Sequence, residues 1–347
     1  MQPFGRDGII TALECLWLQP SLARGVLAYL ASTQASKAVP EQDAEPGKIL
    51  HETRNGEMAA LGEMPFARYY GSVDATPLFV QLAGAYYQRT GDQEFMEAIW
   101  PNIEAALLWM ERSGDRDGDG FLEYSRQSGD GLIHQGWKDS DDAIFHADGT
   151  LARGPIALCE VQAYAYAAWR AGEVLSDALG RPRQSLAFRS YAETFRERFE
   201  AAFWCDDLCS YALALDGDKR PCRVRTSNAG QCLASGIVSP EQARLVAQTL
   251  MTSYSFSGWG VRTTAASEAR CNPMGYHNGG VWPHDNALIA AGFYATACRK
   301  RRRASSPECS TPRCISICTA CRSCSADSRE KKGKGPILYP VACAPQA

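Results

Sequence analysis

The amino-acid sequence predicts an all-α protein, a toroid built from helical hairpins. Three observations favour this fold class over an α/β fold. Apolar residues recur at three- and four-residue intervals through most of the chain. Segments with period-two alternation are few, and long polar loops follow every second predicted helix. In such a ring the helices form the scaffold, and the loops at one end carry the function.

The predicted helices are the segments with helical periodicity, which are residues 9–30, 76–89, 95–110, 155–179, 185–203 and 282–297, with a short helix beginning near Ser239. Pro20 splits the first segment into two helices. Thr76-Pro77 suits a helix N-terminus, and Ser239 opens a capping-box pattern. These helices are fewer than a closed double ring of six hairpins needs. Either the periodicity misses some helices or, as we expect, the ring is incomplete at both ends.

Composition limits the classes of partner. The chain has 347 residues, of which 45% are hydrophobic and 22% charged, which is enough for one large domain or two ordinary ones. A net charge of -3 gives no reason to expect nucleic acid or an anionic membrane as a partner. The sequence contains neither an apolar run of about 18 residues nor a signal-peptide pattern. We expect a cytoplasmic protein.

Polar loops with aromatic or glycine residues recur at residues 3–8, 69–79, 134–142, 257–263 and 275–287. A pyranose has apolar C–H faces that stack on Trp or Tyr, and hydroxyls that pair with Asp, Asn and Arg. Hydrolysis of a glycosidic bond also needs two carboxyl groups, one protonated and one ionised. Five such loops on a helical scaffold indicate a sugar site, and we expect them to converge at one end of the ring.

Nine ordered motifs make the pattern more specific. They are GRDGIITAL, GKILHE, YYGSVDATPLF, DGDGFLEY, QGWKDSDD, SNAGQCL, SGWGVRT, YHNGGVWPHDNALIAAGF and GPILYPVACAPQA. Together they resemble the catalytic domain of bacterial glycogen-debranching-type proteins, the amylo-α-1,6-glucosidase family, over residues 4–293 and 330–347. The resemblance implies an (α/α)6 six-hairpin glycosidase barrel that hydrolyses α-glucosidic bonds with inversion, takes an α-glucan or oligosaccharide and needs no cofactor. Related barrels hydrolyse small glycosides such as mannosylglycerate. Family members usually have an N-terminal β-rich domain, which this sequence does not include.

The resemblance assigns the general acid to the Trp-x-Asp of GWKDS. Asp139 is then the acid, and Trp137 forms a wall of the subsite that holds the sugar ring. An acid that works near neutral pH needs a raised pKa, through burial beside Trp137 or a like-charged neighbour such as Asp141 or Asp142. The alternative is that residues 139–142 form a solvated acidic turn. We expect Asp141 and Asp142 to be loop residues.

Substrate binding is assigned by the same resemblance. Arg6, Asp7 and Asp74 match a clamp on sugar hydroxyls, although the two aspartates could instead be helix caps. The other expected binding residues are Trp259, Arg262, His277, Asn278, Trp282, His284 and Asp285. A buried core histidine is the alternative for His277 or His284 taken alone. Gln231 stands where the family commonly has His, which puts a role for that position in doubt.

Residues 115–124, DRDGDGFLEY, are similar to a calcium loop. Asp115, Asp117 and Asp119 occupy the first three alternate ligand positions. The bidentate Glu of an EF-hand is absent, because Arg126 stands at relative position 12. A turn rich in Asp and Gly is the favoured interpretation, and an ion, if bound, would be structural.

Residues 294–328 depart from the family. The resembled family has its general base in a Pro-Glu-Leu-Phe-like motif shortly before the GPILYPVAC block, and this chain has none. Three interpretations are open: a zinc cluster of Cys314, Cys318, Cys321 and Cys324, a disordered basic tail, or an out-of-frame segment. The third is favoured, since Cys318–Ser328 can be encoded so that another frame reads Tyr-Arg-Leu-Pro-Glu-Leu-Phe-Cys-Gly-Phe. The eight cysteines outside residues 298–324 are expected to be small buried hydrophobes.

The predicted organisation is a catalytic domain at 1–293, an aberrant Cys/Arg-rich segment at 294–328, and a final part of the catalytic domain at 329–347. Because the base is missing, the chain as written is expected to show little or no hydrolysis. A non-catalytic glucan-binding remnant is the alternative function.

Overall fold

The computed structural model describes residues 4–54, 57, 67–303, 325–326 and 337–338. The chain divides into two compact units. The first unit contains Met1–Asp141 and Gly154–Glu197, with Ala347, and the second contains Asp142–Arg153 and Arg198–Gln346. Within the described residues almost all regular structure is helical, and every strand has only two residues.

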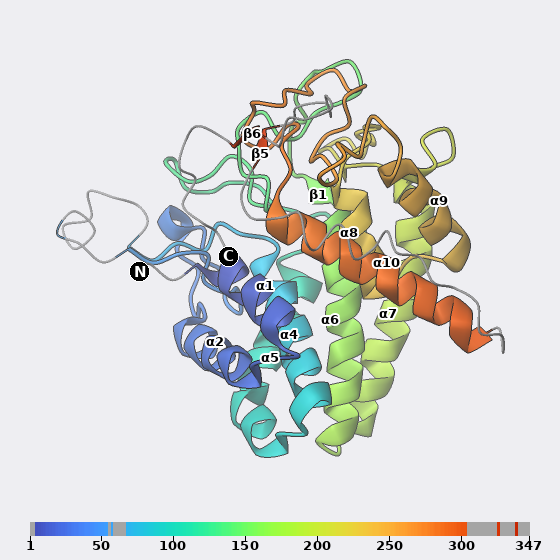
Figure 1. Ribbon diagram of the computed structural model, residues 1–347. Coiled ribbons are helices and arrows are strands. Elements are labelled where there is room, and N and C mark those ends of the chain that lie inside the picture. The colour runs from blue at the N-terminus through green and yellow to red at the C-terminus, as the bar shows by residue number, and fades with distance from the viewer. Residues whose placement is uncertain (1–3, 55–56, 58–66, 304–324, 327–336, 339–347) are drawn as a thin grey trace. The chain divides into compact units, whose positions relative to one another are not determined.

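The first unit consists of helices joined by polar loops (Figure 1). Its elements are α1 (Gly5–Cys15), α2 (Pro20–Thr33), the 3₁₀ helix η1 (Pro40–Gln42), α4 (Ala75–Thr90), α5 (Gln93–Arg112), β1 (Ala157–Leu158), α6 (Cys159–Ala178) and most of α7 (Pro182–Phe203). The predicted break in the first periodic segment is confirmed. Pro20 is the first residue of α2, a position where its missing N–H costs no hydrogen bond.

Local signals set the turn between α4 and α5. Gly91 ends α4 in a left-handed conformation at φ 68°, which is favourable for glycine. Asp92 then caps α5 by accepting a hydrogen bond from the backbone N–H of Phe95, and it also accepts one from the Tyr86 hydroxyl. The hairpin α4–α5 therefore follows from short-range chemistry, as the sequence predicts.

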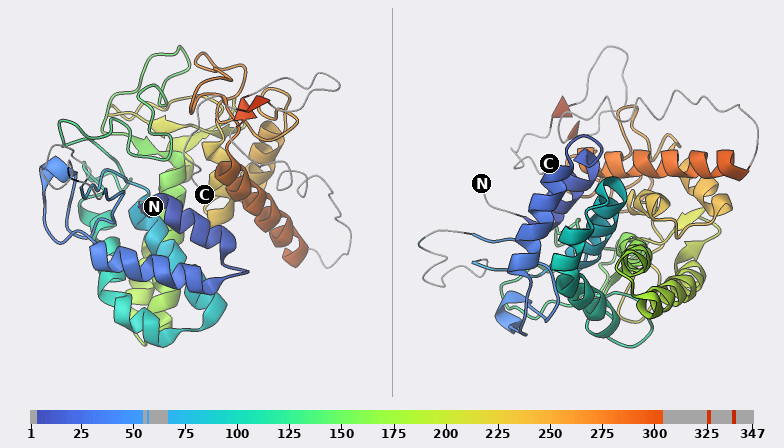
Figure 2. Two further views of the ribbon diagram at one scale, coloured as in Figure 1. Left: turned by 60° about the vertical axis from the view of Figure 1, so that its left-hand side comes forward. Right: turned by 90° about the horizontal axis from the view of Figure 1, so that it is seen from below.

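Small residues let the core helices approach closely. A Cβ built on Gly84 of α4 would lie 2.5 Å from the Cβ of Ala171 on α6. On its other side α6 packs against α7, because Trp169 stacks on Phe188 and Tyr191. Figure 2 shows α1 and α2 beside α4, in agreement with the contacts between these helices.

The second unit contains shorter elements. They are the end of α7, β2 (Trp204–Cys205), β3 (Ser210–Tyr211), β4 (Ala214–Leu215), α8 (Asn228–Ser235), α9 (Pro240–Leu250), α10 (Pro283–Arg303), β5 (Ser325–Ala326) and β6 (Ile337–Leu338). β2 pairs with β3, and β5 with β6, both antiparallel. Gly230 and Gly292 allow α8 and α10 to pack closely, since a Cβ on Gly292 would lie 2.6 Å from that of Leu233.

The predicted N-cap of α9 is confirmed, because the Ser239 hydroxyl accepts a hydrogen bond from the backbone N–H of Gln242, but the Gln242 side-chain oxygen does not complete the capping box. Two helices differ from the prediction. α8 is a helix that the periodicity does not predict, and α10 continues to Arg303, into the segment that the sequence sets apart from residue 294. Arg, Lys and Ala are good helix formers, so a helix already begun at Pro283 can propagate through them.

The candidate zinc cysteines and the segment that encodes Pro-Glu-Leu-Phe in another frame lie almost entirely outside the described residues. Their interpretation stays a prediction. Across the ranges that the structure does describe, no helix is both long and apolar enough to cross a bilayer.

Substitution of the glycine at the contact between α4 and α6 tests the packing. We expect Gly84→Ala to lower the free energy of unfolding by about 1–3 kcal/mol, because the new methyl group would overlap Ala171. The control is Gly25→Ala in α2, where nothing lies within 4 Å of the built Cβ. That change should stabilise the protein by about 0.5–1 kcal/mol. Urea unfolding measures the free energy of unfolding of both variants. Equal changes in the two would contradict the close contact between α4 and α6.

Candidate active site

A buried guanidinium lies at the centre of the first unit's polar residues. Each of the three nitrogens of Arg6 lies near a different carboxylate: Nη1 is 3.2 Å from Asp74, Nε is 3.5 Å from Asp7, and Nη2 is 3.7 Å from Asp139. The side chain of Arg6 is only 5% exposed. The predicted acid and two predicted binding residues, Asp7 and Asp74, are therefore brought together by a third, the cation Arg6.

Glycine positions the start of α1. The backbone N–H of Gly5 donates to the carbonyl of His51, and Phe4 forms an antiparallel bridge with Glu52. A Cβ on Gly5 would lie 1.8 Å from the carbonyl oxygen of Leu50. Only glycine permits this approach, which presents Arg6 and Asp7 in the first turn of the helix. The close approach of Leu50 thus explains why the GRDG motif begins with glycine.

The helix-cap interpretation of Asp7 and Asp74 is not supported. Phe4 is the N-cap of α1, and Asp7 lies within the helix. Asp74 occupies the N-cap position of α4 but forms no cap hydrogen bond. The cap is supplied by Ser72, whose hydroxyl accepts from the N–H of Ala75 and donates to Asp74. The Asp74 carboxylate is therefore directed to Arg6.

Asp139, the predicted acid, lies on a loop that is closed by hydrogen bonds of the His134 side chain. His134 Nε2 is 3.3 Å from the carbonyl oxygen of Asp141, and the other ring nitrogen is 2.7 Å from the Tyr124 hydroxyl. Trp137 is buried within this loop. Asp139 keeps 26% of its side chain exposed, so a substrate can reach its carboxyl group. The solvated-turn interpretation holds only for Asp141 and Asp142, which are exposed.

The charges in this cluster shift several pKa values. Burial raises the pKa of Asp139 to about 6; Arg6 opposes the rise, and the nearby carboxylates of Asp7 and Asp74 add to it. Burial likewise raises the pKa of Asp7. Although burial disfavours its charge, Arg6 has a raised pKa because three carboxylates surround it. Asp139 therefore has the protonation behaviour that a general acid near neutral pH requires.

His51 and Glu52 are not among the predicted site residues, although both belong to the quoted GKILHE motif. His51 is 3% exposed, and its Nδ1 has no hydrogen-bond partner among the described residues. Burial and then the charge of Arg6 lower its pKa well below the ordinary value, so its ring is neutral. Glu52 pairs with Arg54 at 3.2 Å. A neutral His beside the clamp is suited to hydrogen bonding with a hydroxyl.

The aromatic residues of the second unit pack on one another. The His277 ring stacks on Trp282, with centroids 5.2 Å apart, and the Trp282 indole N–H donates to the carbonyl of Tyr276. His277 and Trp282 are buried, whereas His284 and Trp259 are half-buried. Stacking inside the loop is also what a structural role would produce. The predicted sugar contacts of these four residues therefore stay predictions.

The remaining predicted residues of this unit hold its loops together. Arg262 contacts the carbonyl oxygens of Ser253 and Tyr254. The Asn278 amide donates to the carbonyl of Asp142. Asp285, fully buried, accepts a hydrogen bond from the amide of Gln231. Gln231 thus donates to Asp285, as the histidine that the resembled family commonly has at this position could do.

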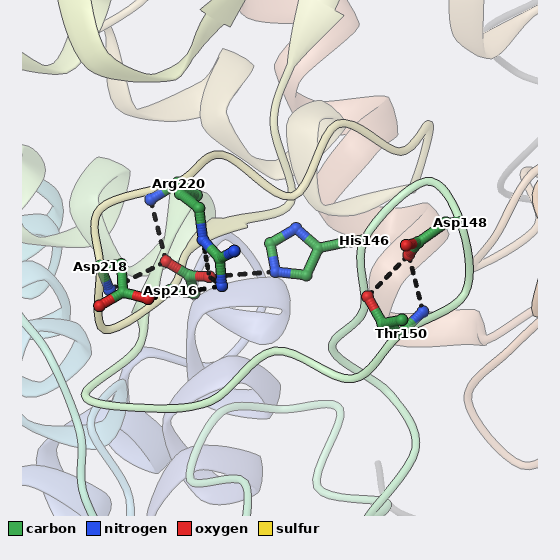
Figure 3. Close-up of polar contacts among 6 residues, drawn as sticks. All are labelled: His146, Asp148, Thr150, Asp216, Asp218 and Arg220. Carbon is green, nitrogen blue, oxygen red and sulfur yellow. Dashed lines mark hydrogen bonds and ion pairs between the residues drawn. The ribbon is translucent and has the colours of Figure 1, made fainter.

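A second polar network fixes residues 142–153, which follow the acid loop in sequence (Figure 3). Asp216 accepts hydrogen bonds from His146 Nε2 and from the backbone and side chain of Arg220. Although burial opposes it, the bonds from Arg220 and Asp218 lower the pKa of Asp216. Asp148 closes the tip of the loop by accepting from the backbone and hydroxyl of Thr150. These contacts tie the segment to Asp216 and close its tip.

The favoured interpretation of the Asp-Gly loop as a turn agrees with its hydrogen bonds. Asp115, Asp117 and Asp119 have carboxylate oxygens within 4.8 Å of one another, which is close enough to share an ion. Each carboxylate, however, accepts a bond from backbone N–H groups of its own loop, at Gly118, Gly120, Asp119 or Phe121. These bonds stabilise the turn from within its own loop, and the binding of an ion stays a prediction.

Comparison with solved structures concerns the fold. A mannosylglycerate hydrolase of family GH63 from Thermus thermophilus, in complex with glucose, is 16% identical with a TM-score of 0.62, over 86% of this chain and 81% of that one. An uncharacterized conserved protein from the same organism is 16% identical with a TM-score of 0.61, over 87% of this chain and 83% of that one. A sialidase is 16% identical with a TM-score of 0.52 over 63% of this chain, and the match covers only 19% of the sialidase. The likeness confirms the predicted fold class, the all-α toroid of these glycosidases.

Sequence comparison identifies the family. No curated protein matches the chain. Residues 5–306 match the model of the mannosylglycerate hydrolase MGH1-like glycoside hydrolase domain. Because this match covers most of the 347 residues, the chain belongs to the MGH1-like glycoside hydrolase family.

Proposed function

We propose that this glycoside hydrolase cleaves α-glucosidic bonds with Asp139 as the general acid. The observation that carries the proposal is the cluster around Arg6, in which a partly exposed carboxyl group has a pKa raised to about 6. Such a group can hold a proton for the leaving oxygen and still release it near neutral pH. Arg6, Asp7 and Asp74 bind sugar hydroxyls around it.

Inversion is the mechanism that the resemblance to amylo-α-1,6-glucosidases implies. It needs a second carboxylate that activates water on the opposite face of the sugar ring. The family motif that would supply this base falls where the sequence is aberrant, outside the described residues. The chain as written therefore binds glucan but turns it over slowly or not at all.

Two substrates remain in competition. The ordered motifs favour an α-1,6-linked glucan, and the family description favours mannosylglycerate. The charge of the first unit's cluster supports one of them. One guanidinium is shared by three carboxyl groups, so a glycerate carboxylate near the acid would meet an excess of negative charge. A neutral glucan avoids this repulsion and is our first candidate.

Restoring the base tests the mechanism. Replacing the residues from Tyr294 to Ser328 by the frame-corrected sequence should raise turnover of an α-1,6-linked oligosaccharide by at least about a hundredfold, as expected when a missing catalytic group is supplied. Released glucose measures the reaction. Mannosylglycerate is the competing substrate in a parallel assay, in which released mannose measures the reaction. Faster turnover of mannosylglycerate would reverse the order of the two candidates.

Removal of the acid tests the role of Asp139. In the frame-corrected protein, Asp139→Asn should lower kcat about 10²–10⁴-fold, because an amide cannot donate the proton. Asp141→Asn, on the same loop but exposed, should leave kcat unchanged. Full activity in Asp139→Asn would reject the assignment.

The pH profile should report the acid. Asp139 must be protonated, so kcat/KM should fall as the pH rises above about 6, the raised pKa of this group. In Asp139→Asn this alkaline limb should disappear from the residual activity. If the alkaline limb instead fell near the ordinary pKa of an aspartate, the fold would not raise the pKa of Asp139.

The raised pKa also predicts a cost in stability. An acid whose pKa is higher in the folded than in the unfolded state destabilises the fold as the pH rises from 3.8 towards 6 and above. Asp139→Asn removes this cost, so at pH above 7 it should raise the free energy of unfolding by about 1–3 kcal/mol. Near pH 4 the variant and the parent should unfold alike. Denaturant unfolding at the two pH values distinguishes this from a simple packing change.

A further inference from the structure

Asp43 is a buried carboxylate that belongs to none of the recognised motifs. It is 2% exposed and stands at φ 50°, in the left-handed region that a residue with a side chain seldom adopts. The buried ammonium of Lys48 donates to its carbonyl oxygen at 3.0 Å. A residue held in this unusual conformation indicates that its side chain is needed in one place.

Four donors converge on the Asp43 carboxylate. Oδ1 accepts from the backbone N–H groups of Gln127 at 2.6 Å and Ser128 at 3.2 Å. Oδ2 accepts from the Tyr69 hydroxyl at 2.8 Å and the Gln135 amide at 3.2 Å. Two of these residues lie at the beginning of the loop that leads to the acid, and Gln135 lies only four positions before Asp139.

Tyr69 extends the same network. Its hydroxyl donates to Asp43 and accepts from the backbone N–H of Leu132 at 2.8 Å. Glycine makes room for it, because a Cβ on Gly71 would lie 2.0 Å from the hydroxyl, and one on Gly131 would lie 2.6 Å from it and 2.7 Å from Asp43 Oδ2. The loop therefore closes around a hydroxyl–carboxylate pair.

Gln135 connects this network to the clamp. Its side chain donates to Asp43, and its carbonyl accepts from the N–H of Val73 at 2.9 Å. Val73 immediately precedes Asp74, the carboxylate that pairs with Arg6. The acid loop and the start of α4 are thus fixed to each other at the residue that Asp43 holds.

We propose that Asp43 is a positioning residue that holds residues 127–135 in place and thereby sets the position of the Asp139 carboxyl group against Arg6. It touches none of the reacting atoms. The inference rests on the proposed function for its catalytic meaning, but the geometry that it asserts can be measured without turnover.

Asp43→Asn tests the proposal with almost no change in size. Every group facing the carboxylate oxygens donates to them, so the amide NH₂ of an asparagine would lose these bonds unless the Tyr69 hydroxyl and the Gln135 amide turned round to accept. We expect the loop to loosen and Asp139 to become more solvated. Its pKa should then fall from about 6 towards the ordinary Asp value. In the frame-corrected protein, kcat should fall about tenfold to a hundredfold with little change in KM.

The measurement is a carboxyl ¹³C titration of the chain as written, labelled at Asp Cγ, with the Asp139 signal identified by its absence in Asp139→Asn. The matched control is Asp92→Asn. Asp92 also accepts bonds from a tyrosine hydroxyl and a backbone N–H, but at the turn between α4 and α5. It should leave the titration of Asp139 unchanged. A second variant, Tyr69→Phe, removes one donor and should lower the pKa of Asp139 by a smaller amount.

An unshifted Asp139 titration in both Asp43→Asn and Tyr69→Phe would overturn the proposal, and so would an equal shift in Asp92→Asn. If Asp43→Asn does not fold, Tyr69→Phe alone decides. Failure of the proposed function has a different signature, because unchanged hydrolysis in Asp139→Asn would reject the acid while the titration still reports whether Asp43 positions the loop.

Discussion

The site depends on the burial of one guanidinium. Taking Arg6 out of water is unfavourable unless its charge is compensated, and three carboxylates of the first unit compensate it. They come from the first turn of α1, the N-terminus of α4 and the loop after residue 134. A single cation therefore fixes three segments of the chain. Burial, together with the neighbouring carboxylates of Asp7 and Asp74, raises the pKa of Asp139 to about 6.

Close approach of backbones makes this arrangement possible, and glycine makes the approach possible. Gly5 lets α1 begin against the carbonyl of Leu50, and Gly131 leaves space for the Tyr69 hydroxyl. A Cβ on Gly136, just before Trp137, would lie 2.3 Å from a methyl carbon of Leu158. The glycines of these loops are explained by packing, and the polar side chains between them by the charge of the cluster. The loops of the first unit are consequently closely packed around the proposed acid.

Family membership identifies the class of reaction, whereas the local electrostatics bear on the choice of substrate. The MGH1-like family establishes a glycoside hydrolase, and structural neighbours at 16% identity establish only the fold. The choice of substrate depends on charges near the scissile bond. In the first unit one guanidinium is shared by three carboxyl groups, and the proposed preference for a neutral sugar chain rests on this balance. Stability and function also oppose each other here, since the raised pKa that would serve catalysis weakens the folded state.

The helices could be predicted because their signals are local. Pro20 begins α2 and Ser239 caps α9 as their positions in the sequence indicate, and the motif around Trp137 points to the candidate acid. Tertiary structure alone decided the rest. Asp74 has the sequence of a cap, yet it pairs with an arginine 68 residues away, and Asp43 holds a backbone 84 residues away. Burial, which shifts the pKa values of Asp139 and His51, arises only when such distant segments pack together, so no local pattern records it.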